Sequence, residues 1–173
     1  IQIYADFTGY MDIVSGVSHI LGIELAENFR QPYFAVSVED FWQRWHMTLG
    51  HWFRDYLFYP IALGKRTRSI EKKVRERFGP RAGKLATSAI ASFWVWSATG
   101  LWHGANWTFL IWGWLNMAVM LFSQVMDPVY EKARQIFRIS LSSKSWNGFR
   151  ILRTFCLICF FRFFSRADSV GSA

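Results

Sequence analysis

Trp102-His103-Gly104-Ala105-Asn106-Trp107 lies in the middle of 38 residues, Leu85 to Phe122, that contain no Asp, Glu, Lys or Arg. This run is longer than the roughly 20 residues that one helix needs to cross a bilayer. Gly100 and Gly104 offer a break, so we expect two helices of about 17 residues each, with His103 at the hairpin between them. Ionisable residues inside a membrane usually face a protein interior or a water-filled cavity. We therefore interpret His103 as a functional residue.

Composition supports a membrane protein. The chain of 173 residues is 52% hydrophobic and 19% aromatic, with 10 Trp and 17 Phe. An aromatic content this high is typical of side-chain belts at the membrane interfaces. We predict an all-α fold, specifically a multi-pass helical integral membrane protein with interfacial amphipathic helices, present here as a fragment of a larger bundle.

Basic residues are concentrated in two segments, 64–84 and 127–144, and the net charge is +8. Clusters of Lys and Arg between apolar spans mark cytoplasmic loops attracted to anionic lipid. We expect both segments to be loops on the cytoplasmic side of the cytoplasmic membrane. Nucleic-acid binding is disfavoured, because no base-stacking or groove-reading module accompanies the charge.

The first apolar segment, residues 1–23, is unusually polar for a membrane span. At 100° per residue Asp12 and His19 share one stripe, and Asp6 and Tyr10 are paired four residues apart. A helix with such a stripe should turn it toward neighbouring helices or water. A purely structural Asp–His or Asp–Tyr hydrogen bond between helices explains the pattern equally well.

A second helix is predicted from Ser37, which together with Asp40 resembles a capping box. Aromatic residues from Phe41 to Tyr56 share one face of this expected helix, which predicts an interfacial position. His46 lies at the edge of the aromatic face, whereas His51 lies on the polar side.

Two histidines, His46 and His103, are thus placed in apolar surroundings, which favour a neutral imidazole able to accept a proton. An interfacial hydrogen bond is the alternative for His46. The two are not at metal-ligand spacing, and no serine-nucleophile elbow, phosphate-binding loop or dinucleotide fingerprint is present. We interpret Cys156 and Cys159 as small packing residues on one helix face.

Six stretches resemble the membrane-bound O-acyltransferase family, in particular its bacterial alginate O-acetylase branch. They occur in the family's order along nearly the whole chain. The stretches are Asp6-Phe7-Thr8-Gly9-Tyr10-Met11-Asp12-Ile13, Asn28-Phe29-Arg30-Gln31-Pro32-Tyr33, Asp40-Phe41-Trp42-Gln43-Arg44-Trp45-His46, Trp52-Phe53-Arg54-Asp55-Tyr56-Leu57, Trp102-His103-Gly104-Ala105-Asn106-Trp107-Thr108-Phe109 and Phe163-Phe164-Ser165-Arg166-Ala167-Asp168.

The resemblance implies that His103 is the essential catalytic histidine and that His46 is the second histidine flanking a reaction tunnel. It further implies that residues 1–173 are the C-terminal portion of such a domain, with earlier and final spans missing. Residues of the matching stretches that we expect to contact substrate are Asn106, Trp102, Trp45, Asp6, Tyr10 and Asp12.

The resemblance also implies the reaction. An acyl group, most simply acetyl, would pass from a cytoplasmic thioester, acetyl-CoA or an acyl carrier protein, to hydroxyls of an extracytoplasmic polysaccharide or of a carrier partner. A hydrolase-like partner outside the membrane is expected, and no tightly bound cofactor or metal is. D-alanyl transfer to teichoic acid is the nearest alternative. A transporter or proton channel that uses the intramembrane His and Asp residues, and a structural subunit that docks a partner, are the alternatives from other classes.

Overall fold

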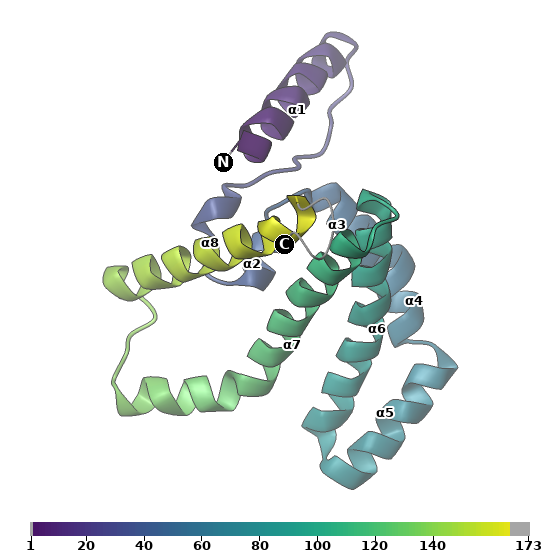
Figure 1. Cartoon of the computed structure of the whole chain (residues 1–173), viewed down its shortest axis with the longest axis vertical. Coiled ribbons are helices and arrows are strands. Elements are labelled where there is room, and N and C mark those ends of the chain that lie inside the picture. The colour runs from purple at the N-terminus through teal and green to yellow at the C-terminus, as the bar shows by residue number, and fades with distance from the viewer. Residues whose placement is uncertain (1, 167–173) are drawn as a thin grey trace.

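A computed structural model describes residues 2–166, and the regular structure of this range is helical apart from one isolated bridge between Phe29 and Trp45 (Figure 1). The predicted all-α class is confirmed for this range. The long helices are α1 (Gln2–Ile20), α5 (Lys65–Phe78), α6 (Pro80–His103), α7 (Trp107–Ile136) and α8 (Lys144–Arg166). The short ones are the 3-10 helix η1 (Pro32–Phe34), α2 (Val38–Trp42), α3 (Met47–Phe53), the π-helix η2 (Arg54–Phe58) and α4 (Tyr59–Ala62).

The central feature of the fold is the antiparallel hairpin of α6 and α7, which turns at residues 104–106 and leaves His103 as the last residue of α6. The break expected near Gly104 is confirmed, but both helices are longer than predicted, with 24 and 30 residues. Pro80 can start α6 because the first turn of a helix does not use its N–H groups. At the other end, α7 continues through Pro128 and bends in its second half (Figure 1).

Glycine allows α6 and α7 to approach closely near this turn. A Cβ on Gly113 would lie 2.6 Å from the carbonyl oxygen of Trp96, and one on Gly100 would lie 2.8 Å from that of Phe109. Both contacts are shorter than side-chain carbons tolerate. The hairpin that carries His103 therefore depends on residues without side chains at the helix crossing.

The prediction that residues 64–84 and 127–144 are loops is wrong. The first segment forms α5 and the start of α6, and much of the second belongs to α7. Lys, Arg and Glu are good helix formers, so a solvated basic stretch can be helical. In α5 the ammonium of Lys72 lies 4.0 Å from the carboxylate of Glu76, one turn away.

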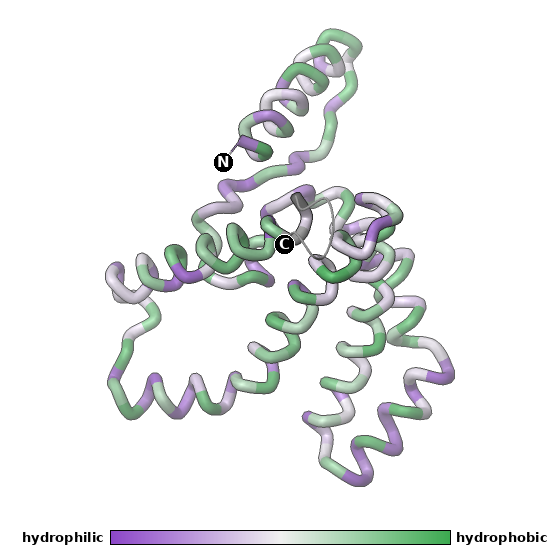
Figure 2. Tube along the Cα trace, in the orientation of Figure 1, coloured by the Kyte–Doolittle hydropathy of each residue, from purple (hydrophilic) through white to green (hydrophobic). Residues whose placement is uncertain are grey.

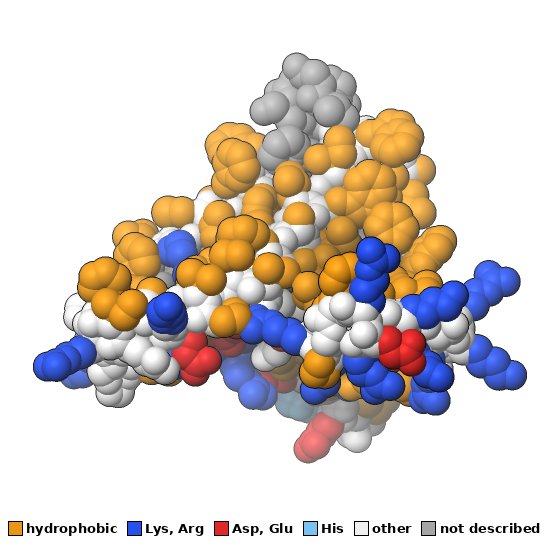
Figure 3. Space-filling model, turned by 90° about the horizontal axis from the view of Figure 1, so that it is seen from below, with side chains coloured by type: hydrophobic (Ala, Val, Ile, Leu, Met, Phe, Trp, Pro, Cys, Tyr) orange, Lys and Arg blue, Asp and Glu red, His pale blue; other side chains and the backbone are white. Residues whose placement is uncertain are grey.

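Charge and hydropathy are nevertheless segregated as a membrane protein requires. The tube in Figure 2 alternates between hydrophilic and hydrophobic along α5, whereas the first half of α7 is mostly hydrophobic. In the view from below, Lys and Arg side chains gather in a band at the lower margin of a broad hydrophobic surface (Figure 3). The cytoplasmic position of this band stays a prediction.

Of the described helices, α7 alone combines enough length and apolar character to cross a membrane. Only 17% of its most apolar 18-residue stretch is buried within the chain. A core helix of a soluble protein would be mostly covered. The outward-facing side chains of α7 instead suit lipid or further helices. The expectation of several spans stays a prediction.

The single amphipathic helix predicted from Ser37 onward is also wrong in its extent. Ser37 does cap α2, since its Oγ accepts a hydrogen bond from the Asp40 N–H at 3.1 Å. The helix then ends after five residues, and α3 begins only at Met47. Between them the chain doubles back to pair with Phe29, and His46 adopts the left-handed conformation, with φ of 49° and ψ of 51°.

The core lies where α2, α6, α7 and α8 meet. Phe41 of α2 packs with Ile158 of α8 in one buried cluster, and Trp96, Trp112 and Phe161 form a second. Trp42 packs against the second cluster. These contacts bring α2 against α7 and α8 and so create the walls of a cavity.

Candidate active site

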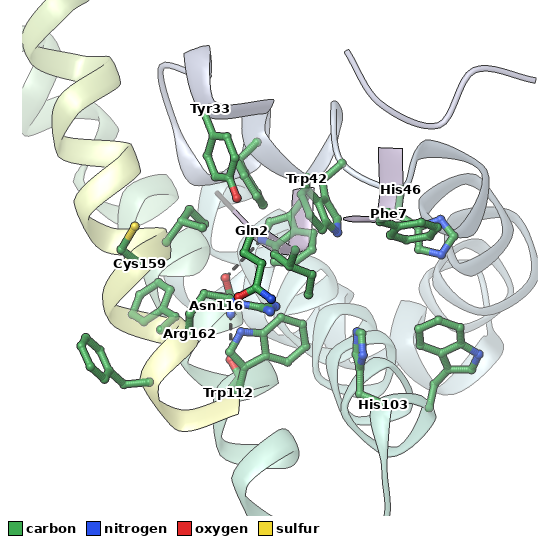
Figure 4. A pocket seen from close by; sticks show the side chains of 17 residues that line it. Gln2, Phe7, Tyr33, Trp42, His46, His103, Trp112, Asn116, Cys159 and Arg162 are labelled. Carbon is green, nitrogen blue, oxygen red and sulfur yellow. Dashed lines mark hydrogen bonds between the residues drawn. The ribbon is translucent and has the colours of Figure 1, made fainter. Parts of the chain in front are cut away.

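A cavity of about 470 Å³ lies at this junction, and both His46 and His103 line it (Figure 4). Its walls come from α1, η1, α2, the turn before α3, the end of α6, α7 and α8, and they are mainly aromatic. The lining residues are Gln2, Ile3, Phe7, Tyr33, Phe41, Trp42, Trp45, His46, Trp102, His103, Trp112, Asn116, Ile158, Cys159, Phe161, Arg162 and Phe163.

His103 is held by aromatic rings on several sides. Its imidazole meets the rings of Trp102 at 4.8 Å and of Trp112 at 5.1 Å, both nearly perpendicular, and stacks on Phe109 at 6.0 Å between centroids. In Figure 4 the ring points from the end of α6 into the cavity. His103 is nevertheless an exposed residue, so these rings flank the imidazole without enclosing it.

His46 reaches the same cavity from the turn between α2 and α3. Its ring meets Phe7 of α1 edge-on at 5.0 Å and Trp102 at 5.9 Å between centroids. Burial lowers the pKa of His46, because desolvation disfavours the charged imidazolium. At neutral pH this imidazole is therefore uncharged, as the sequence predicted from its apolar surroundings.

Trp102 links the two histidines, because its indole contacts both imidazoles. Trp45 also lines the cavity, stacked on Phe41 at 5.7 Å and edge-on to Phe29 at 5.0 Å. The structure thus brings four of the predicted site residues, His46, His103, Trp45 and Trp102, to one cavity.

The other four predicted site residues do not line the cavity. Asn106 caps α7 by accepting a hydrogen bond from the Thr108 N–H at 3.1 Å. Asp6, Tyr10 and Asp12 are exposed on α1, as is His19, so the ionisable stripe faces no other described element. That these residues contact substrate stays a prediction.

Sequence reasoning missed Asn116, a fully buried residue in the middle of α7 that lines the cavity. Its Oδ1 accepts a hydrogen bond from the indole Nε1 of Trp42 at 3.1 Å, and its Nδ2 donates to the Trp112 carbonyl at 2.8 Å. An amide inside a long apolar run was a signal in the sequence, although an uncharged one. Asn116 therefore joins α2 to α7, the helix whose Trp112 ring contacts His103.

The α8 side of the cavity was also missed. Arg162, Cys159 and Tyr33 line it (Figure 4). Burial raises the pKa of Tyr33, an effect that the nearby Arg162 guanidinium partly offsets. Cys156 and Cys159 are both exposed, so the interpretation of these cysteines as packing residues is wrong for the described chain. The matching stretch from Phe163 to Asp168 extends beyond the described residues.

The chemistry available is proton transfer in a largely apolar enclosure. Its polar groups include two imidazoles, the amides of Gln2 and Asn116 and the guanidinium of Arg162, and the imidazoles are the groups able to exchange a proton near neutral pH. Within residues 2–166, no group of three or more His, Cys, Asp or Glu residues is arranged to hold a metal ion.

Comparison with known proteins gives a consistent result. No family model matches the chain. The chain is 40% identical over 86% of its length to a protein of Pseudomonas aeruginosa named "Probable alginate O-acetylase AlgI". It is 36% identical over 66% of its length to a peptidoglycan O-acetyltransferase of Helicobacter pylori, and 32% identical over 91% to a teichoic acid D-alanyltransferase of Bacillus subtilis. It spans 26%, 19% and 36% of the lengths of these relatives, respectively.

Proposed function

Because the chain belongs to the membrane-bound O-acyltransferase family, we propose that the protein is an enzyme that transfers an acyl group to a hydroxyl of the cell envelope. We take the acyl group to be acetyl, since the alginate and peptidoglycan relatives are named as acetyl-transferring enzymes. The observation that carries the proposal is that His46 and His103, from distant parts of the chain, line one aromatic cavity.

In this proposal His103 is the general base. The acceptor hydroxyl gives its proton to the imidazole while its oxygen bonds to the thioester carbonyl carbon. The tetrahedral intermediate then collapses, the carbon–sulfur bond breaks, and the leaving thiolate takes the proton from His103. An ester and a free thiol result, and His103 returns to its neutral state.

The walls of the cavity support this assignment of roles. Trp112 and Phe109 flank the His103 ring and would favour its orientation toward the cavity. His46 contacts the same Trp102 ring and would orient the acceptor hydroxyl. The largely apolar walls of this partly open cavity of about 470 Å³ would limit the access of water to a thioester.

The donor and acceptor remain proposals. The donor would be acetyl-CoA or an acyl carrier protein on the cytoplasmic side, acting as a substrate rather than a resident cofactor. The acceptor would be an extracytoplasmic polysaccharide, reached directly or through a hydrolase-like partner. The band of basic residues in Figure 3 supports a cytoplasmic-membrane position with that band at the cytoplasmic face.

Replacing His103 with Ala tests the proposal. Membranes that contain the full-length protein are supplied with a labelled acetyl thioester, and acetyl esters in envelope polysaccharide are counted. His103→Ala should abolish transfer while the protein stays inserted and folded, whereas His51→Ala, which lies outside the cavity, should retain it. Parent-level transfer by the His103→Ala variant would refute the assignment.

D-alanyl transfer is the second candidate, favoured by the 32% identity to the teichoic acid D-alanyltransferase of Bacillus subtilis. The same membranes supplied with a D-alanyl thioester distinguish the two. Incorporation of D-alanine rather than acetate would move the assignment to the second candidate without changing the role of His103.

A further inference from the structure

Asn28 lies in the connection between α1 and η1 and bonds to the turn that carries His46. Its side-chain Oδ1 lies 3.2 Å from Nδ1 of His46. The same oxygen accepts hydrogen bonds from the Thr48 hydroxyl at 2.6 Å and from the Thr48 N–H at 3.4 Å. The Asn28 carbonyl also accepts from the Met47 N–H at 3.0 Å. Asn28 therefore holds both the ring and the backbone of this turn.

These contacts decide which nitrogen of His46 carries the hydrogen. A backbone N–H can only donate, so the Asn28 atom that Thr48 contacts must be the oxygen and not the amide nitrogen. An amide oxygen can only accept, so Nδ1 of His46 must donate to it. In the neutral ring that burial favours, Nε2 is consequently the nitrogen with a free lone pair.

We propose that Asn28 is a positioning residue that fixes His46 as the Nδ1–H tautomer, so that Nε2 is the atom that accepts a hydrogen bond or proton in the cavity. This inference rests on the proposed function for its catalytic meaning. It makes His46 an acceptor for the incoming hydroxyl and not a neutral donor to the oxyanion. Because the hydroxyl carries a single proton, it would donate to only one of the two histidines at a time.

The charged groups around His46 are few, so the protonation of its imidazole should respond to a single added charge nearby. The titratable groups that share the cavity with His46 are His103 from α6, Arg162 and Cys159 from α8, and Tyr33 from η1. On α2, Asp40 is occupied by its ion pair with Arg44 at 2.7 Å. No carboxylate is among the cavity-lining residues of the described chain, so an Asp at position 28 would introduce one beside the ring.

Two variants of the full-length protein separate a positioning role from a structural one. In Asn28→Asp a carboxylate would still accept from Nδ1–H but would stabilise the imidazolium, so the acidic limb of kcat/KM should move up by about one pH unit or more. In Asn28→Ala the tautomer is no longer held, and kcat should fall by about ten- to a hundredfold, as for other partners that orient a functional imidazole. Asn147→Asp, which adds the same charge at the start of α8, should leave the profile in place.

Each result of the pH series either supports or overturns the proposal. An acidic limb of Asn28→Asp that coincides with that of the parent would overturn it, as would parent-level kcat in Asn28→Ala. Loss of transfer by Asn28→Asp at every pH would also overturn it, because the carboxylate keeps the acceptor and should preserve activity at high pH.

Nitrogen NMR of the labelled imidazoles tests the tautomer without any acyl transfer, and so separates this inference from the proposed function. The His46 resonances are assigned by their disappearance in His46→Asn. The parent should show a protonated Nδ1 and an unprotonated Nε2 at neutral pH, and Asn28→Ala should lose this preference. A protonated Nε2 in the parent would overturn the assignment of the Nδ1–H tautomer, even if acyl transfer is intact.

Discussion

Trp42 and Asn116, 74 residues apart in the chain, are joined by a hydrogen bond in which the indole Nε1 of Trp42 donates to the amide Oδ1 of Asn116 at 3.1 Å. The bond connects short helix α2 with the interior of α7. Asn116 is fully buried, and the Trp112 ring on the same helix lies 5.6 Å from the Trp42 ring. Since the Trp112 ring also contacts the His103 imidazole, this bond links the position of α2 to the geometry of the candidate active site.

Breaking this bond should destabilise the protein. Trp42→Phe and Asn116→Leu should each cost about 1–3 kcal/mol of unfolding free energy, because the first leaves the buried Asn116 oxygen unpaired and the second leaves the partly buried Trp42 N–H unpaired. The double variant should cost less than the sum, with a coupling of about 0.5–1.5 kcal/mol. Denaturant unfolding in detergent of the parent, the two single variants and the double variant measures this coupling. Additive effects would mean that the bond does not form.

Close packing of the α6–α7 hairpin gives a second prediction. Gly113→Ala would place a methyl group 2.6 Å from the Trp96 carbonyl oxygen and should destabilise the fold by about 1–3 kcal/mol. Gly148→Ala in α8 meets nothing within 4 Å and should be neutral or stabilise by up to about 1 kcal/mol. Thermal unfolding of the two variants side by side provides the comparison, and equal melting temperatures would contradict the packing argument.

Asn106 allows its capping role to be separated from substrate binding. Asn106→Ala removes the acceptor of the Thr108 N–H and should cost about 1 kcal/mol, whereas Asn106→Ser keeps a capping oxygen and should retain most of the stability. If capping is its whole contribution, acyl transfer measured per folded molecule should be the same in both variants. A large loss of kcat in a stable Asn106→Ser protein would restore the predicted contact with substrate.

The pKa of His46 sets an expectation for pH dependence. Because burial lowers this pKa, the ring is half-protonated at a pH below its usual value of about 6.5, and transfer should persist to lower pH than an ordinary imidazole would allow before it declines. In His46→Asn the pH profile of kcat/KM should lose the contribution of His46 to this acidic limb and keep that of the His103 base, whereas His51→Asn should leave the profile unchanged. A parent limb centred above pH 6.5 would contradict the assignment.

The break near Gly104 and the aromatic neighbours of His46 and His103 could be predicted from the sequence, whereas the meeting of the two histidines was implied only by the family resemblance. Both rest on local signals, namely a charge-free run too long for one span and histidines placed among aromatic residues. The basic segments were misjudged because clustered charge indicates exposure to solvent or lipid headgroups and carries little information about backbone conformation.

The turn at His46 could not be predicted because the aromatic periodicity continues through it. Its cause is non-local, since the bridge from Trp45 to Phe29 and the hydrogen bonds to Asn28 come from a segment that precedes α2. Asn116 was overlooked for a related reason. Its partner Trp42 belongs to another helix, and a neutral amide does not interrupt a run defined by the absence of charge.

The backbone at position 46 determines which replacements are informative. With φ of 49°, this residue occupies a region that costs an ordinary L-amino acid about 1–2 kcal/mol but that Asn and Gly enter readily. An alanine or a β-branched residue there would disturb the course of the chain together with the chemistry, and lost activity could not be attributed to the missing ring. Asparagine deletes the imidazole and leaves the fold of the turn undisturbed.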